Sequence, residues 1–146
     1  LMLLLVGGLM AWAIGWKTVL MVHLPIVLIA GALGVWLFYV QHTFENAYWT
    51  RGKDWDSNEA AINGSSFFDL PRVLHWFTGN IGYHHIHHLA SRIPNYRLRE
   101  AFLSHPALQA GPRLTIWTSF KSARLKLWDE ELKRMVGFPK RQRASA

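Results

Sequence analysis

The sequence contains no cysteine among its 146 residues. This absence excludes a disulfide scaffold, a zinc site built on cysteine and a cysteine-bound iron–sulfur cluster. Acidic side chains are scarce, with nine Asp and Glu against 16 Lys and Arg. Any metal ion in this protein must therefore be held by histidine, carboxylate, amide or water.

Charged residues are almost missing from the first part of the chain. Residues 1–41 contain Lys17 as their single charged side chain, and all nine acidic residues follow Gln41. A basic region can indicate nucleic acid, but no nucleic-acid-binding motif accompanies this charge, so we expect no nucleic-acid partner. Lys and Arg also concentrate on the cytoplasmic flanks of membrane helices, and this asymmetry places the region after Gln41 in the cytoplasm.

Two apolar runs, residues 1–15 and 18–40, predict a transmembrane helical hairpin with its turn at residues 15–17. The second run carries no formal charge and is long enough to span a bilayer. The first run is shorter than the roughly 20 residues that a span needs. Because the chain also lacks an initiator methionine, we expect the first helix to begin outside this sequence.

The remaining sequence predicts short helices joined by polar loops, so the predicted fold is an all-α integral membrane protein with a cytoplasmic helical cap. Asp69 is the expected N-cap of a helix that ends near Thr78. Residues 114–136 have the pattern of a basic amphipathic helix, and a disordered tail is expected from Lys140. The predicted regions are the hairpin (1–41), a histidine-containing cytoplasmic region (42–112), and the basic amphipathic helix with its tail (113–146).

Four of the eight histidines lie within five consecutive positions, 84–88. In a helix, His84, His87 and His88 share one face, whereas His85 points elsewhere. Three imidazoles on one face can bind iron, copper or zinc without a cysteine or carboxylate. The alternative is a solvated histidine-rich helix, but histidine is neither a strong helix former nor a common surface residue. The pattern therefore favours a metal site.

The H-x-x-H-H spacing at 84–88 resembles the third histidine box of the membrane fatty acid desaturases and related hydroxylases. Residues 39–44, Y-V-Q-H-T-F, are similar to the Y-x-Q-H-T motif that follows the last membrane helix of acyl-lipid desaturases. Leu89 and the I-P-N-Y sequence at 93–96 resemble the continuation of the third box. The family's two earlier boxes, of the H-x-x-x-H and H-x-x-H-H kinds, do not occur here, so the chain looks like the C-terminal part of a desaturase.

The resemblance implies a di-iron centre that uses O2 and two electrons to introduce a double bond into a fatty acyl chain, as in the Δ12-like acyl-lipid enzymes. It implies four iron ligands, with no catalytic residue separate from them, in a set completed by the two absent boxes: His42, His84, His87 and His88. Without the resemblance, His42 would be read as an interfacial histidine. Gln41 is expected to support the ligands, Asn80 to be an extra ligand or a supporting amide, and His85 to lie either near the ligands in a supporting role or at the surface. The chain by itself is expected to be inactive, because a partly assembled site rarely holds its metal in working geometry.

Two other functions remain open. A fatty acyl hydroxylase or ketolase of the same superfamily shares the histidine boxes and differs in its product. A non-enzymatic membrane metal-binding protein would use the histidine helix as its whole site. A zinc protease is not expected, because the H-E-x-x-H motif is absent. For the enzymes, the expected partners are a membrane lipid or acyl substrate and an electron donor such as ferredoxin or cytochrome b5.

Overall fold

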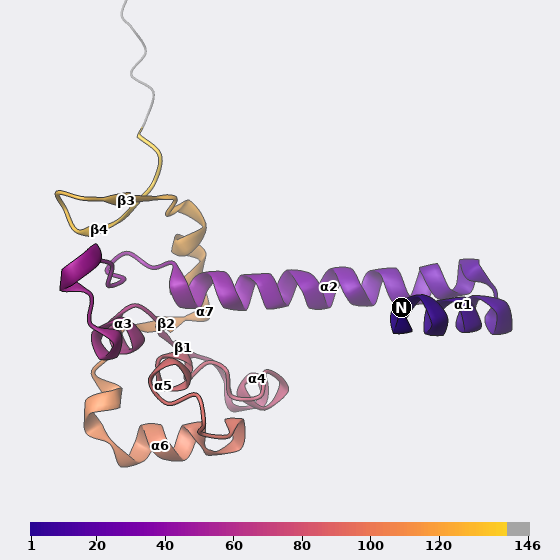
Figure 1. The fold of residues 1–146 in the computed structure, drawn as a ribbon, viewed down its shortest axis with the longest axis horizontal. Coiled ribbons are helices and arrows are strands. Elements are labelled where there is room, and N and C mark those ends of the chain that lie inside the picture. The colour runs from indigo at the N-terminus through magenta and orange to yellow at the C-terminus, as the bar shows by residue number, and fades with distance from the viewer. Residues whose placement is uncertain (140–146) are drawn as a thin grey trace, which may run out of the picture. The chain divides into compact units, whose positions relative to one another are not determined.

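A computed structural model describes residues 1–139, so the tail expected from Lys140 lies outside the described residues. The chain divides into two compact units, Leu1–Leu37 and the part that begins at Phe38. Helices dominate the described chain, and its strands are short (Figure 1).

The first unit is a pair of apolar helices. Helix α1 spans Met2–Ile14, Gly15 turns the chain with a φ of 85°, and helix α2 spans Trp16–His42 and continues into the second unit. The two helices lie side by side (Figure 1). They line a groove of about 410 Å³ that includes His23. By length and composition α2 could cross a membrane, and α1 is a shorter apolar helix. The two predicted helices are therefore confirmed.

The second unit consists of short helices and strands. After α2 they follow in this order: η1 (Gly52–Asp54), α3 (Ser57–Asn63), β1 (Phe67–Asp69), α4 (Arg72–Phe77), α5 (His84–Leu89), η2 (Asn95–Arg97), α6 (Leu98–Ser104), η3 (Pro106–Gln109), β2 (Arg113–Thr115), α7 (Ile116–Ser119), η4 (Phe120–Arg124), β3 (Leu127–Asp129) and β4 (Arg134–Val136).

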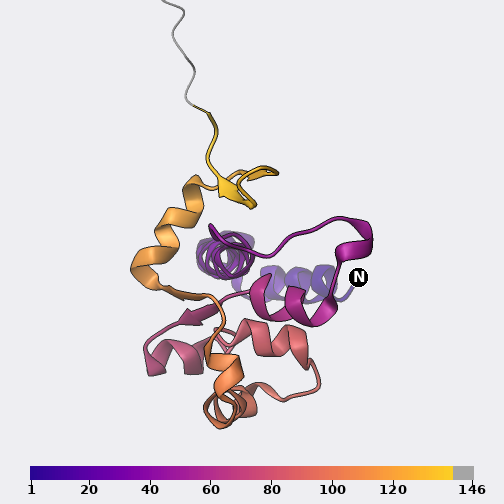
Figure 2. The same cartoon turned by 90° about the vertical axis from the view of Figure 1, so that its left-hand side faces the viewer.

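The histidine helix α5 packs against elements that precede it and elements that follow it in the sequence. It lies beside α3, as Figure 1 and Figure 2 show, and it also contacts β1 and α6. Phe67 of β1 forms an isolated bridge with Tyr83, the residue before α5. The buried core consists of Phe67, Tyr83, Ile86 and Leu98. One side of α5 is therefore packed into the core, which restrains the direction of the histidines on its other side.

The all-α prediction is wrong in part, because the second unit contains two small sheets. Strands β1 and β2 pair in parallel, with Phe67 opposite Arg113, and β3 and β4 form an antiparallel pair. The prediction of an N-cap at Asp69 is also wrong. Asp69 lies in β1 and forms an ion pair with Arg113, and α4 begins after Pro71 without a side-chain cap. This pairing joins residues far apart in sequence, so no local pattern indicates it.

The single amphipathic helix predicted for residues 114–136 is wrong. A capping box between Thr115 and Thr118 starts α7, but the helical segment ends with η4. The Tyr39 hydroxyl lies 3.1 Å from the carbonyl oxygen of Ser122 and 2.8 Å from that of Leu125. Further on, the Asp129 carboxylate accepts hydrogen bonds from two backbone N–H groups and holds a tight turn between β3 and β4. These contacts outweigh the helical spacing of the apolar residues.

Candidate metal centre

A tight turn places the first histidine of α5. Gly79 and Asn80 both have a positive φ, 60° and 59°, a conformation that glycine and asparagine adopt most easily. The Asn80 backbone N–H donates to the His75 carbonyl at 2.6 Å, and its side-chain amide donates to the Asn95 carbonyl at 3.1 Å. Asn80, expected near the ligands, is therefore engaged in holding the turn that leads into α5.

Three imidazole nitrogens converge where α2 ends beside α5. The Nε2 atom of His42 lies 3.2 Å from that of His84 and 3.0 Å from that of His88, and the Nε2 atoms of His84 and His88 are 3.0 Å apart. Nitrogens about 2.0–2.1 Å from a shared ion are separated by about 2.8–3.4 Å in octahedral or tetrahedral coordination. The spacing of the three atoms therefore fits one metal ion bound by all three histidines.

His42 presents an unprotonated nitrogen to this group. Its Nδ1 lies 2.8 Å from the Phe38 carbonyl oxygen, one turn earlier in α2. A carbonyl oxygen only accepts hydrogen bonds, so the proton of the neutral ring is on Nδ1 and the lone pair is on Nε2. An outer hydrogen bond of this kind is typical of metal-binding histidines, because it selects the tautomer and orients the ring. The sequence prediction missed Phe38, although a histidine in the last turn of a helix often bonds one of the final carbonyls.

The surroundings of the cluster favour neutral imidazoles. Burial lowers the pKa of His84 to about 3, and the neighbouring His42 and His88 lower it further. Burial also lowers the pKa of His88, with smaller contributions from His42 and His87. Neutral imidazole is the form that binds metal, so the lowered pKa values of His84 and His88 favour the ligand state of both side chains.

Acidification is expected to destabilise the protein when a chelator keeps it metal-free. Because the folded-state pKa of His84 is about 3, the unfolded chain binds more protons than the folded chain between pH 6.5 and about 3. The stability contributed by neutral His84 is therefore complete above its unfolded pKa and is lost as the pH falls toward the folded value. The measurement is the free energy of unfolding in urea at about pH 7.5 and about pH 5.

A His84→Asn variant is the matched control for this measurement, because asparagine does not titrate. Its free energy of unfolding should depend less on pH than that of the unchanged protein. The same dependence in both proteins would contradict the assignment of the effect to His84.

The structure separates the other two histidines of α5 from this group. His87 lies beside His84, with ring centroids 5.7 Å apart, but its nitrogens are not among the three that converge. His85 is fully buried, with its Nε2 2.8 Å from the Leu108 carbonyl oxygen and its ring near Phe67 and Phe102. A surface position for His85, one of the two expected, is therefore wrong. Its ring joins α5 to the η3 segment.

Gln41 supports the site through the backbone. Its side chain is 1% exposed, and its amide donates to the Ile81 carbonyl at 2.8 Å. Its own carbonyl accepts a hydrogen bond from the Ser66 N–H at 3.0 Å. These bonds connect the end of α2 to the residue before β1 and to the loop before α5. Gln41 thus helps to bring His42 to α5, whereas the oxygen that receives the ring proton of His42 belongs to Phe38.

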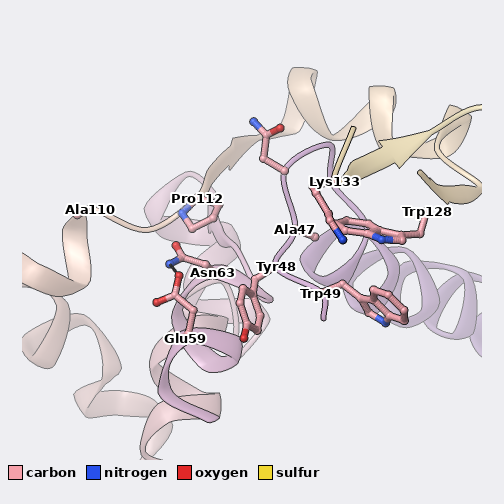
Figure 3. A pocket seen from close by; sticks show the side chains of 10 residues that line it. Ala47, Tyr48, Trp49, Glu59, Asn63, Ala110, Pro112, Trp128 and Lys133 are labelled. Atoms are coloured by element: carbon pink, nitrogen blue, oxygen red, sulfur yellow. Dashed lines mark hydrogen bonds between the residues drawn. The ribbon is translucent and has the colours of Figure 1, made fainter. Parts of the chain in front are cut away.

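A cavity of the second unit lies apart from the histidine cluster. It has a volume of about 510 Å³, and the residues that line it include Tyr48, Trp49, Asn63, Trp128 and Lys133 (Figure 3). None of its lining residues, all within the described part of the chain, is a histidine. The cluster and this cavity are therefore two different sites.

The chain is similar to known desaturases. Residues 1–120 match the family model described as fatty acid desaturase. A "Fatty acid desaturase" of Bacillus subtilis is 51% identical over 124 residues, covering 85% of this chain and 35% of the relative. The "sn-1 oleoyl-lipid 12-desaturase" of Synechocystis is 36% identical over 70 residues, 48% of this chain and 19% of the relative. The "sn-1 acyl-lipid omega-3 desaturase (ferredoxin)" of the same organism is 31% identical over 98 residues, 64% of this chain and 26% of the relative.

This chain spans about a third of the length of the Bacillus subtilis relative. The matched region includes the end of α2, the whole of α5 and therefore all three histidines of the cluster. On the extent of the family match and on the identity to the Bacillus protein, the chain belongs to the fatty acid desaturase family.

Proposed function

We propose that this chain is part of a membrane-bound di-iron desaturase that introduces a double bond into the acyl chain of a lipid, using O2 and two electrons. The single observation that supports this most strongly is the convergence of His42, His84 and His88 within 3.0–3.2 Å in a chain of the desaturase family. A histidine-rich ligand set with open coordination positions suits iron that must bind oxygen.

In this proposal each of the four predicted iron ligands has a defined role. His42, His84 and His88 hold one iron ion through Nε2, and the Phe38 carbonyl fixes the tautomer of His42. His87 holds the second ion, because its ring lies beside His84 and is free of the first group. We expect the remaining ligands from segments outside this sequence, since the chain matches 35% of the Bacillus relative. When bound, the iron supplies the oxidising power that no side chain has.

The proposed setting is an integral membrane protein with its histidines on the cytoplasmic side. Helix α2 is long and apolar enough to cross the bilayer and ends at His42, so it can place one ligand at the membrane surface. The Lys and Arg that follow Gln41 favour a cytoplasmic position for the second unit. The names of the Synechocystis relatives support an acyl lipid as substrate and a ferredoxin as electron donor, and cytochrome b5 is the other donor class.

Lipid analysis tests the proposal. The complete reading frame that contains this chain would be expressed in a host without polyunsaturated lipids, and its fatty acids would be profiled by mass spectrometry. We expect a new double bond at one position, absent from the empty-vector control. Expression of the 146-residue chain alone is expected to give no product. A hydroxylated product would move the assignment to the hydroxylases, and an unchanged profile with a working electron donor would contradict the enzyme proposal.

A further inference from the structure

A second cavity lies among α4, the turn before α5, and α6. It has a volume of about 220 Å³ and shares no residue with the histidine cluster. Six residues line it: Arg72, His75, Trp76, Asn80, Tyr83 and Arg99. We call it the arginine pocket, because one arginine from each of two helices lines it.

The charge of the arginine pocket is not neutralised by the protein. Within residues 1–139, neither Arg72 nor Arg99 forms an ion pair with a carboxylate. Asp69, which acts electrostatically on Tyr83, is paired with Arg113 instead. Two arginines that line one small cavity and have no carboxylate partner in the described chain match an anion with several oxygen atoms, such as a phosphate.

Tyr83 adds a hydrogen-bond donor to the pocket. Burial raises the pKa of its phenol, and the charge of Arg99 together with a hydrogen bond from the Arg99 side chain opposes the shift, so the hydroxyl stays protonated at neutral pH. The pocket thus offers two cations and a hydroxyl from three separate elements. Three such groups arranged around one cavity can surround an anion from several sides.

An exposed apolar surface lies next to these cations. Three side chains of α4 are largely exposed: Val73 at 64%, Trp76 at 75% and Phe77 at 73%. Trp76 belongs both to this surface and to the pocket. A soluble anion has no apolar part that could contact such a surface, whereas a phospholipid has acyl chains that can. In a membrane, the phosphate lies at the depth where tryptophan and arginine contact the headgroups, and the acyl chains lie deeper in the bilayer.

We propose that the arginine pocket binds the phosphate of a phospholipid headgroup while the exposed side of α4 contacts the acyl region. This inference rests on the membrane setting of the proposed function and on no step of its chemistry. The occupant is one lipid molecule held by Arg72, Arg99 and Tyr83.

Lipid binding to the purified, chelator-treated complete protein that contains this chain tests this proposal by native mass spectrometry in a phosphate-free detergent. The probes are dioleoyl phosphatidate and dioleoylglycerol, which differ only in the phosphate. We expect phosphatidate to bind at least about tenfold more tightly than dioleoylglycerol, and the Arg72→Gln/Arg99→Gln variant to lose at least about tenfold of that affinity. Because metal is absent, the result is independent of any desaturation, and a failure here leaves the desaturase proposal standing.

The matched control is Arg92→Gln/Arg97→Gln, which removes the same charge from two exposed arginines outside the pocket. Its phosphatidate affinity should stay within about twofold of the unchanged protein. Equal losses in the two double variants, or no loss in the pocket variant, would overturn the proposal. Displacement of the lipid by an equal concentration of inorganic phosphate would identify a site for free phosphate instead. If the double variant does not fold, Arg72→Lys should weaken binding while keeping the charge, since it removes the paired donors.

Discussion

Replacing His84 by alanine is expected to remove the metal from the cluster and to abolish desaturation by the complete protein. Its Nε2 is 3.2 Å from that of His42 and 3.0 Å from that of His88, and His84 is the most buried of the three side chains. Without it, only His42 and His88 of the three converging ligands remain. We expect iron affinity to fall by more than about tenfold and the new double bond to disappear from the lipid profile.

The iron content of the purified complete protein measures this effect directly. His105→Ala is a suitable control, because His105 is exposed at the end of α6 and lies outside the cluster. It should retain its iron and its product. Full iron content in His84→Ala, in protein whose circular dichroism is unchanged, would show that the three histidines do not share an ion.

His87→Ala separates the two proposed ions. Because the His87 nitrogens lie outside the group of three, its loss should leave the ion held by His42, His84 and His88 in place. We expect iron to fall from two ions to one per protein and activity to be lost. Retention of both ions would assign His87 a role other than ligand.

Gly82→Ala is expected to cause the largest loss of stability among single substitutions near the site. A Cβ atom at Gly82 would lie 2.5 Å from the Phe68 carbonyl oxygen and 2.5 Å from the Cε1 atom of His75. Neither neighbour moves easily, because the Phe68 N–H donates to the Gly82 carbonyl at 2.8 Å and His75 is buried. We expect the free energy of unfolding to fall by about 2–3 kcal/mol, near the upper end for overpacking.

Urea unfolding of the 146-residue chain in detergent measures this change. Gly31→Ala provides the comparison, since a Cβ atom there meets nothing within 4 Å and alanine favours a helix more than glycine. It should leave stability unchanged or raise it slightly. Equal stability of Gly82→Ala and the unchanged chain would mean that β1 and α5 separate at little cost, contrary to the close packing described.

The sequence alone determined the features that depend on neighbouring residues. Long apolar runs predict α1 and α2 because the extent of an uncharged apolar helix follows directly from composition, and the observed bounds agree closely. The spacing at 84–88 places His84 and His88 one turn apart in any helix, and their Nε2 atoms are in fact 3.0 Å apart. The same motifs were sufficient to indicate the family, which the matches confirm.

The tertiary structure alone decided which histidines meet. His42 reaches His84 across 42 positions because Gln41 and β1 fasten the end of α2 to the loop before α5, and no helical period contains that information. It also turned the segment after Thr115 into a short helix and a hairpin, since contacts with Tyr39 replaced the helical bonds that local spacing predicts. Local patterns set what each segment favours, whereas contacts between distant segments select among those conformations, and here they assemble the cluster.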